Sequence, residues 1–263
     1  YAGTDDGFIQ VSSDGGANWN RIPVTNLGIP GRSFVNDIKA DLFDENTVYV
    51  ALDNHKEGDF SSYLFKSTNK GASWQSIAGN IPENTLVWRL VQDHVNKNLL
   101  FAATEKGIYT SMELPGSPTI PFRDITIQKN HNDLVGASFG RGFFVLDDYS
   151  ALREITSETT NKEGTLFPTR EAHWYVPKST IGNTGADFYF AKNPDFGAVF
   201  TYHLAKEFTD IEKERKDAEK ELEKKNLNIP FAGWDNLEKE RRQEDAKIWI
   251  TIKDQAGNVI RNV

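Results

Sequence analysis

An eight-residue pattern occurs twice in this chain, at residues 12–19 and again at residues 67–74. Both copies read Ser-x-Asp/Asn-x-Gly-x-x-Trp, and both follow a short apolar run. An Asp or Asn side chain accepts hydrogen bonds from the backbone of its own turn, and glycine adopts a positive φ without steric cost. The pattern therefore predicts a hairpin turn followed by a Trp whose ring covers the hairpin. Its defining residues are Ser12, Asp14, Gly16 and Trp19 in the first copy and Ser67, Asn69, Gly71 and Trp74 in the second.

The repetition extends well beyond this pattern. Residues 35–51 match residues 87–103, and residues 1–9 match residues 101–109, with a looser third copy at residues 134–144. Short β-rich runs that recur about every 50 residues are what the four-stranded blades of a β-propeller require. We expect residues 1–155 to be the last blades of such a propeller, whose missing amino-terminal blades belong to an earlier part of the same protein.

Composition excludes several classes of function. The chain has 263 residues, no cysteine and a net charge of −8. Without cysteine there is no disulfide, thiolate metal site or Cys nucleophile. The excess of negative charge disfavours a nucleic-acid partner, because binding to phosphates needs a basic surface. No apolar run approaches the roughly 20 residues that span a bilayer, so we expect no membrane span in this segment.

A second domain is expected after the propeller blades. Residues 156–164 are polar and predict a linker. Residues 165–263 contain short strand-like runs at 165–168, 172–176, 187–190 and 197–204. Residues 247–260 then predict a strand, a turn and a second strand. We interpret this region as part of a β-sandwich of the immunoglobulin or fibronectin kind, so that the whole chain is mainly β.

Residues 206–246 interrupt that β-rich region with a densely charged segment. Pairs such as Glu212 with Lys216 and Glu221 with Lys225 have the spacing that supports a helix. Asp235 and Glu238 resemble a capping box at the start of a second helix. The segment predicts a helical hairpin inserted in the sandwich. Its charged surface is either a solvated face or a partner-binding arm.

Three further motifs carry a family resemblance. They occupy residues 53–67, 101–109 and 140–148. Together with the repeated turn pattern, which is similar to the Asp-box (BNR) repeat, they resemble large bacterial proteins with sortilin-like or "glycosyl hydrolase" propellers and a trailing sandwich domain. The resemblance implies a secreted or bacterial envelope location. It leaves the activity open, because the hydrolase name in that family follows from the Asp-boxes. True sialidases also need an arginine triad, a Tyr nucleophile and an acidic partner, and no such set is found in this sequence.

Propeller geometry predicts which residues share a face. In a blade, the loop between the second and third strands opens on one end, and the Asp-box turn lies at the other. A ligand face is expected where charged and aromatic residues converge. The candidates for this face are Asp53, His55, Asp59, Trp88, Arg89 and Arg141, with Asp5, Asp6, Arg32, Glu57 and Glu105 on the same side.

Each candidate has alternative interpretations. Asp53, His55 and Asp59 could hold a divalent cation, the one cofactor we consider, or could clasp their own loop by hydrogen bonds. Asp5, Asp6 and Glu105 are candidates for the paired carboxylates of a glycosidase. Two functions follow: a non-enzymatic propeller that recognises a peptide, protein or glycan, and a glycoside hydrolase acting on a polysaccharide. We favour recognition, because no pair of acids stands out by its motif. A peptidase is disfavoured, since no Ser-His-Asp set or His-Glu-x-x-His motif occurs.

Overall fold

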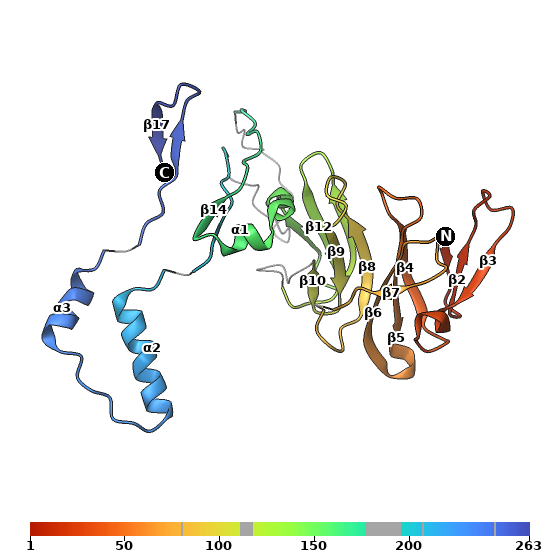
Figure 1. The fold of residues 1–263 in the computed structure, drawn as a ribbon, viewed down its shortest axis with the longest axis horizontal. Helices are drawn as coiled ribbons and strands as arrows, with labels where there is room; N and C mark the ends of the chain where they lie inside the picture. The colour runs from red at the N-terminus through yellow and green to blue at the C-terminus, as the bar shows by residue number, and fades with distance from the viewer. Residues whose placement is uncertain (80, 111–117, 177–195, 207, 245) are drawn as a thin grey trace, which may run out of the picture. The chain divides into compact units, whose positions relative to one another are not determined.

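The computed structural model describes residues 1–79, 81–110, 118–176, 196–206, 208–244 and 246–263. The fold is mainly β and consists of several small antiparallel sheets (Figure 1). The chain divides into two compact units. The first unit comprises residues 1–156 and 167–201, and the second comprises residues 157–166 and 202–263.

The first unit contains four sheets, each built from strands that are consecutive in the chain. The first sheet consists of β1 (Ala2–Gly3), β2 (Phe8–Val11) and β3 (Asn20–Pro23). The second consists of β4 (Phe34–Ala40), β5 (Val48–Asn54), β6 (Asp59–Ser67) and β7 (Gln75–Ser76). The third consists of β8 (Val87–Gln92), β9 (Leu100–Thr104) and β10 (Gly107–Tyr109). The fourth consists of β11 (Phe122–Gln128), β12 (Asp133–Ser138) and β13 (Phe143–Leu146). Three short 3₁₀ helices, η1 (Val24–Leu27), η2 (His55–Glu57) and η3 (Tyr149–Glu154), follow β3, β5 and β13.

Successive sheets pack face to face. Side chains of a strand alternate between its two faces, so a strand between two sheets must be apolar on both. In β5, Val50 and Leu52 join the core shared with the first sheet, whereas Tyr49 and Ala51 join the core shared with the third. β9 repeats the arrangement, because Phe101 packs toward the fourth sheet. All seven residues of β5 are buried as a result.

The first strands of adjacent sheets also lie side by side: β4 contacts β8, and β8 contacts β11. Polar groups join β4 to β8 directly. Asn36 Nδ2 donates to the carbonyl of Val87 at 2.9 Å, and the backbone N–H of Leu90 donates to a carboxylate oxygen of Asp37 at 3.0 Å. Asp37 is buried, so this bond satisfies a carboxylate that would otherwise be costly to bury. The sheets are thus held together by hydrogen bonds as well as by apolar contact.

The two copies of the repeated pattern, which we call Asp-boxes for their similarity to that repeat, form turns with matching hydrogen bonds, between β2 and β3 and between β6 and β7. Ser12 Oγ accepts from the backbone N–H of Gly16 at 2.8 Å, and Ser67 Oγ accepts from that of Gly71 at 2.9 Å. Asp14 accepts from the N–H of residue 18 at 2.9 Å, as Asn69 does from that of residue 73. The glycines have φ of +95° and +88°, the left-handed region that excludes most side chains.

The two Trp residues that close these turns have different surroundings. Trp74 packs against the core between the first and second sheets. Its neighbour Gly71 lies so close to the first sheet that an added Cβ would be 3.1 Å from Ile22 Cδ1. Trp19, in contrast, is 49% exposed, and its indole N–H donates to the carbonyl of Gly16 at 3.0 Å. The packing role predicted for Trp19 is therefore limited to its own turn among the described residues, because none of the described sheets covers it.

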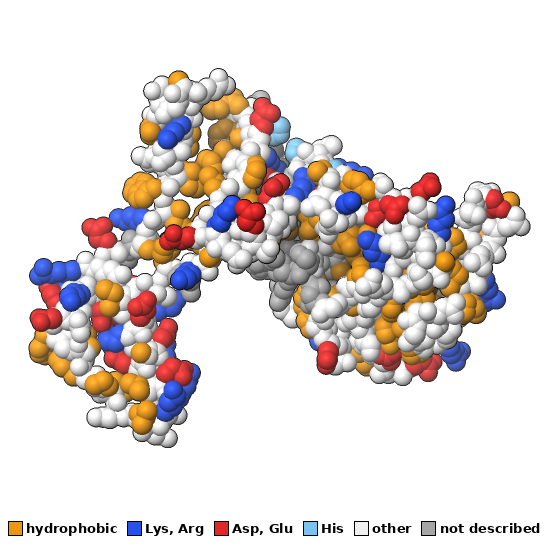
Figure 2. Space-filling model, in the orientation of Figure 1, with side chains coloured by type: hydrophobic (Ala, Val, Ile, Leu, Met, Phe, Trp, Pro, Cys, Tyr) orange, Lys and Arg blue, Asp and Glu red, His pale blue; other side chains and the backbone are white. Residues whose placement is uncertain are grey.

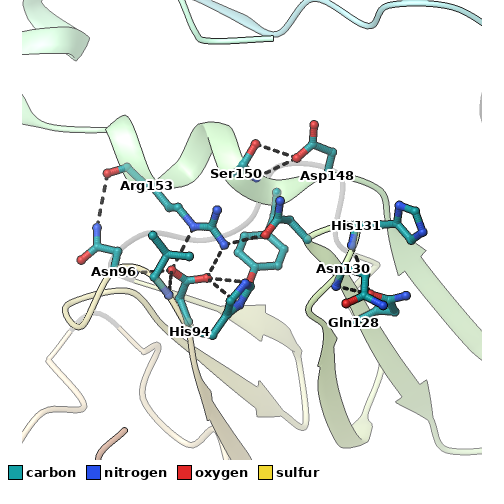
Figure 3. Close-up of polar contacts among 12 residues, drawn as sticks. His94, Asn96, Gln128, Asn130, His131, Asp148, Ser150 and Arg153 are labelled. Carbon is teal, nitrogen blue, oxygen red and sulfur yellow. Dashed lines mark hydrogen bonds and ion pairs between the residues drawn. The ribbon is translucent and has the colours of Figure 1, made fainter. Parts of the chain in front are cut away.

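A buried carboxylate fastens the end of the fourth sheet to the third. Asp93 follows β8 and is fully buried. Arg153, in η3, donates to both of its oxygens at 2.9 and 2.7 Å, and the Tyr149 hydroxyl donates at 2.6 Å (Figure 3). Burial alone would raise the pKa of Asp93, but these hydrogen bonds and those from two backbone N–H groups hold it at about 2. Asp41, the matching residue after β4, similarly accepts from Tyr49 and from Gln92 of the third sheet.

The second unit contains two separate hairpins. β14 (Gly164–Leu166) pairs with β15 (Tyr202–Leu204), and β16 (Thr251–Lys253) pairs with β17 (Val259–Asn262). These hairpins are what the described residues contain of the predicted sandwich. The strand expected at residues 172–176 does not form, and the one expected at 187–190 lies outside the described residues.

The predicted linker, residues 156–164, has secondary structure of its own. It includes the short helix α1 (Ser157–Asn161) and the first residue of β14. Glu158 and Lys162 form an ion pair of 3.2 Å at the spacing that supports a helix. Thr165 Oγ1 donates to the carbonyl of Thr159 at 2.9 Å, which ties the strand back to the helix. The polar sequence thus forms local structure instead of a free connection.

Two helices form within residues 206–246: α2 (Ile211–Lys224) and α3 (Trp234–Arg242). They are joined by Arg215, which donates to both carboxylate oxygens of Glu240 at 2.7 and 3.0 Å. Charged side chains of both signs cover them (Figure 2). Glu212 pairs with Lys216, as expected, whereas Glu221 pairs with Lys224 instead of Lys225. α3 begins with Gly233 as its N-cap, so Asp235 lies in the first turn and does not cap the helix.

We predict that Leu52→Ala destabilises the first unit by about 2–5 kcal/mol, because it leaves a cavity between two sheets. Leu52 is fully buried. Urea unfolding of the variant and the wild type measures the change. Leu42→Ala is the matched control, since Leu42 is 55% exposed. A change of less than about 0.5 kcal/mol is expected for the control, and equal losses in the two variants would contradict the packing described here.

We predict that the unfolding free energy of the Asp93→Asn variant depends less on pH under acidic conditions than that of the wild type. The pKa of Asp93 is about 2 in the folded chain and about 3.9 when unfolded. A depressed pKa stabilises the fold above the unfolded value, and this contribution, about 2 kcal/mol, is lost as the pH falls from about 4 to 2. Unfolding free energies measured across that window should fall less steeply in the variant. Asp124→Asn, at a carboxylate that is 67% exposed, should leave the wild-type slope unchanged.

Candidate ligand-binding site

The turns of the four sheets divide between two ends of the first unit. Because adjacent strands are antiparallel, the β5–β6 turn and the second Asp-box lie at opposite ends of β6. The β1–β2, β9–β10 and β12–β13 turns correspond to the β5–β6 turn. We call the end that carries these turns the site end. Most of the residues predicted for a ligand face lie in or beside them.

A hollow of about 340 Å³ lies at the site end between the first and second sheets. Charged groups of both signs surround it, together with one aromatic ring. Its lining residues are Asp5, Asp6, Arg32, Phe34, Asp53, Asn54, Lys56 and Glu57. The hollow thus brings together residues from the β1–β2 turn, the approach to β4 and the β5–β6 turn.

Asp53 is the most buried of the carboxylates in the hollow, with 2% of its surface exposed. It contacts His55 Nδ1 through one carboxylate oxygen and also accepts from the backbone N–H of His55 at 3.2 Å. These bonds hold the start of η2 in place. Lys56, the next residue, places its Nζ 5.0 Å from the centre of the Phe34 ring. Asp53 and His55 therefore clasp their own loop, one of the two roles considered for them.

A cluster of aromatic and charged side chains continues from His55 across the third and fourth sheets. The rings of His55 and Trp88 meet edge to face, with centroids 5.9 Å apart. Trp88 Nε1 donates to Glu105 at 2.8 Å. The Arg123 guanidinium lies 3.7 Å from the centre of the Trp88 ring, 5.4 Å from that of Phe139 and 3.6 Å from Glu105. We refer to these five residues as the Trp88 cluster.

The first strands of three sheets share an irregularity that explains this cluster. The pairing of β4 with β5 shifts between Val35 and Asp37, and that of β8 with β9 shifts between Val87 and Arg89. The pairing of β11 with β12 shifts between Phe122 and Asp124. A bulge re-aims the side chain of the extra residue. The extra residues occupy equivalent positions and are Asn36, Trp88 and Arg123.

Arg123 and Phe139 were not predicted as site residues. A signal for Arg123 exists in the sequence, because Val87-Trp88-Arg89 and Phe122-Arg123-Asp124 occupy the same place in their repeats. The match is hard to see because only one apolar position is shared. Phe139 lies in residues 134–144, the looser third copy of the repeat, and is 70% exposed. Sequence alone does not separate it from an ordinary surface residue.

Three of the predicted face residues belong neither to the hollow nor to the Trp88 cluster. Asp59 accepts from the Tyr63 hydroxyl at 2.6 Å and from the backbone N–H of Ser61. Burial alone would raise the pKa of Asp59, but these bonds lower it below its usual value. Arg89 donates to the carbonyl of Asn36 at 2.8 Å and pairs with acidic side chains on β4 and β11. Arg141 is exposed in the β12–β13 turn and has no polar partner among the described residues.

The three side chains considered for a divalent cation, Asp53, His55 and Asp59, do not form one cluster. Within the described part of the chain, no group of three or more His, Asp and Glu side chains is arranged to hold a metal ion. The reason is visible in the contacts. Asp53 and His55 bond to each other, whereas Asp59 is held by Tyr63 within its own hairpin.

The candidate catalytic carboxylates separate into two places. Asp5 and Asp6 line the hollow. Asp6 also accepts from Thr4 Oγ1 and pairs with Arg21 at 3.3 Å. Glu105 is not among the lining residues and is instead held by Trp88 and Arg123. The carboxylates that share the hollow with Asp5 and Asp6 are Asp53 and Glu57.

No protein-family model matches this chain, and no curated protein is similar enough to be matched. In the described part of the chain, no helix combines the length and the apolar character needed to cross a bilayer.

Proposed function

We propose that the first unit is a run of β-propeller blades and that its site end recognises a peptide, protein or glycan ligand. Four features support the blade assignment: consecutive antiparallel strands, face-to-face packing, adjacent first strands and a bulge repeated in three sheets. The resemblance to Asp-box proteins supports a secreted or envelope location and a sandwich for the second unit.

The observation that carries this proposal is the continuity of the site end. The hollow is joined through Asp53 and His55 to the Trp88 cluster. This surface draws residues from all four sheets, so it is set by a rigid scaffold and not by one loop. A concave surface with a few converging polar groups and aromatic rings is the usual form of a binding site.

A glycoside hydrolase is the alternative function, and one observation favours it. Asp5, Asp6, Asp53 and Glu57 line the same hollow, and glycosidases use two carboxylates on either side of the scissile bond. Recognition remains our preference, because Asp53 is bonded to His55 and Asp6 is paired with Arg21. Both of these carboxylates are thus occupied by protein partners.

We predict that Trp88→Ala weakens ligand binding about tenfold or more, because it removes the ring between His55 and Arg123. Binding would be measured on glycan and peptide arrays and then by calorimetry on the strongest array hit. Trp19→Ala is the matched control, since Trp19 is a half-exposed indole in an Asp-box at the opposite end. Equal losses in both variants would contradict the placement of the site.

Polysaccharide cleavage tests the alternative. Sugar release by the wild type that collapses in Glu57→Gln or in the Asp5→Asn/Asp6→Asn variant would establish the hydrolase and contradict a purely recognising role. Turnover that survives in these variants would place catalysis outside the hollow.

A further inference from the structure

The hollow contains ionised groups of both signs that lack a protein partner. Asp5, Glu57 and Arg32 all line it. None of these three side chains forms a hydrogen bond or an ion pair with another described residue, whereas Asp6 and Asp53 are each bonded to a neighbour. Two carboxylates and one guanidinium are therefore available to a ligand in the same concave space.

The remaining walls of the hollow differ in character. Phe34 supplies an apolar ring, and the Lys56 ammonium lies over it. Asp53, at 2% exposure, adds a negative charge that water reaches poorly. A charge with little access to solvent attracts an opposite charge more strongly than an exposed one does. The hollow thus combines an attractive place for a cation, a guanidinium for an anion and an apolar surface for a carbon chain.

We infer that the hollow binds a peptide through one basic and one acidic side chain, with the carbon chain of the basic residue against Phe34. Its basic group pairs with Asp5 and Glu57, and its carboxylate pairs with Arg32. Neutral glycans carry neither charge. Acidic glycans carry only the negative one and would meet the carboxylates of the hollow. Peptides carry both kinds of charge. The inference rests on the proposed recognition function and specifies its ligand class.

The volume is compatible with this assignment. Pockets for small ligands typically measure about 300–1,000 Å³, and the hollow, at about 340 Å³, lies at the lower end of that range. It can hold part of a peptide but not a folded partner. The rest of the peptide would extend along the site end toward the Trp88 cluster.

The test uses the full chain and a blocked pentapeptide, acetyl-Gly-Lys-Gly-Asp-Gly-amide, in calorimetric titrations. Companion peptides replace the Lys by acetyl-lysine or the Asp by Asn, and neutral and acidic oligosaccharides form a second panel. Because each charge pair at a binding surface contributes to specificity, we expect each single replacement to weaken binding about tenfold.

Variants assign each charge to its partner. In Arg32→Gln, the preference for Asp over Asn in the peptide should disappear while the preference for Lys remains. In Glu57→Gln, the preference for Lys over acetyl-lysine should fall. Glu45→Gln and Lys129→Gln are charge-matched controls in turns at the opposite end, and both residues are exposed. They should bind the pentapeptide as the wild type does.

The outcomes separate the inference from the proposed function. Peptide binding that does not depend on one of the two charges would overturn the peptide inference. So would a preference for an oligosaccharide whose binding is weaker in Trp88→Ala. Either result would be compatible with recognition at the site end. An absence of binding across both panels would overturn the inference. If the glycan and peptide arrays also show no binding, the proposed recognition function would be contradicted as well.

Discussion

The structure of the first unit depends on burying both faces of its inner sheets against other sheets. β5 shows the constraint most clearly, because Tyr49 and Leu52 face different neighbours and neither faces water. The sheets have only three or four strands each, and the apolar face of a sheet must be buried against another element. Each therefore contributes to the stability of the next. Buried carboxylates add hydrogen bonds between different elements: Asp93, after β8, accepts from Arg153 and Tyr149 of η3.

This constraint also separates structure from candidate function within each repeat. Strand interiors are fixed largely by packing, so most residues of the candidate site lie in or beside the turns or at the bulged residues of three first strands. In the second, third and fourth sheets that residue is Asn36, Trp88 and Arg123. Asn36 bonds the neighbouring strand, while Trp88 and Arg123 stack on each other. The same backbone feature thus joins two sheets in one repeat and positions residues of the Trp88 cluster, part of the proposed recognition surface, in the others.

Sequence reasoning succeeds where the determinants are local and fails where they are not. The Asp-box turns follow from side-chain bonds within five residues, and the charged segment contains helices because its pairs are spaced by one turn. The contact between Arg123 and Trp88 joins different repeats and has no local signature. Residues 172–176 are apolar enough for a strand but form none, since a strand also needs a partner. Likewise, Asp53, His55 and Asp59 are close in sequence, but Asp53 and His55 bond to each other whereas Asp59 bonds to Tyr63.

The hydrogen bonds of the two Asp-boxes give the motif a structural role in its own turn. Their hydrogen bonds match, yet Trp74 is packed and Trp19 is half exposed. The difference arises from the neighbouring sheet and not from the box. The exposure of Trp19 and Trp74 is therefore set by packing outside their turns. Function is therefore to be sought where equivalent positions differ in chemistry, as they do at the site end, where a hydrogen-bonding amide, an indole and a guanidinium occupy the same place in successive repeats.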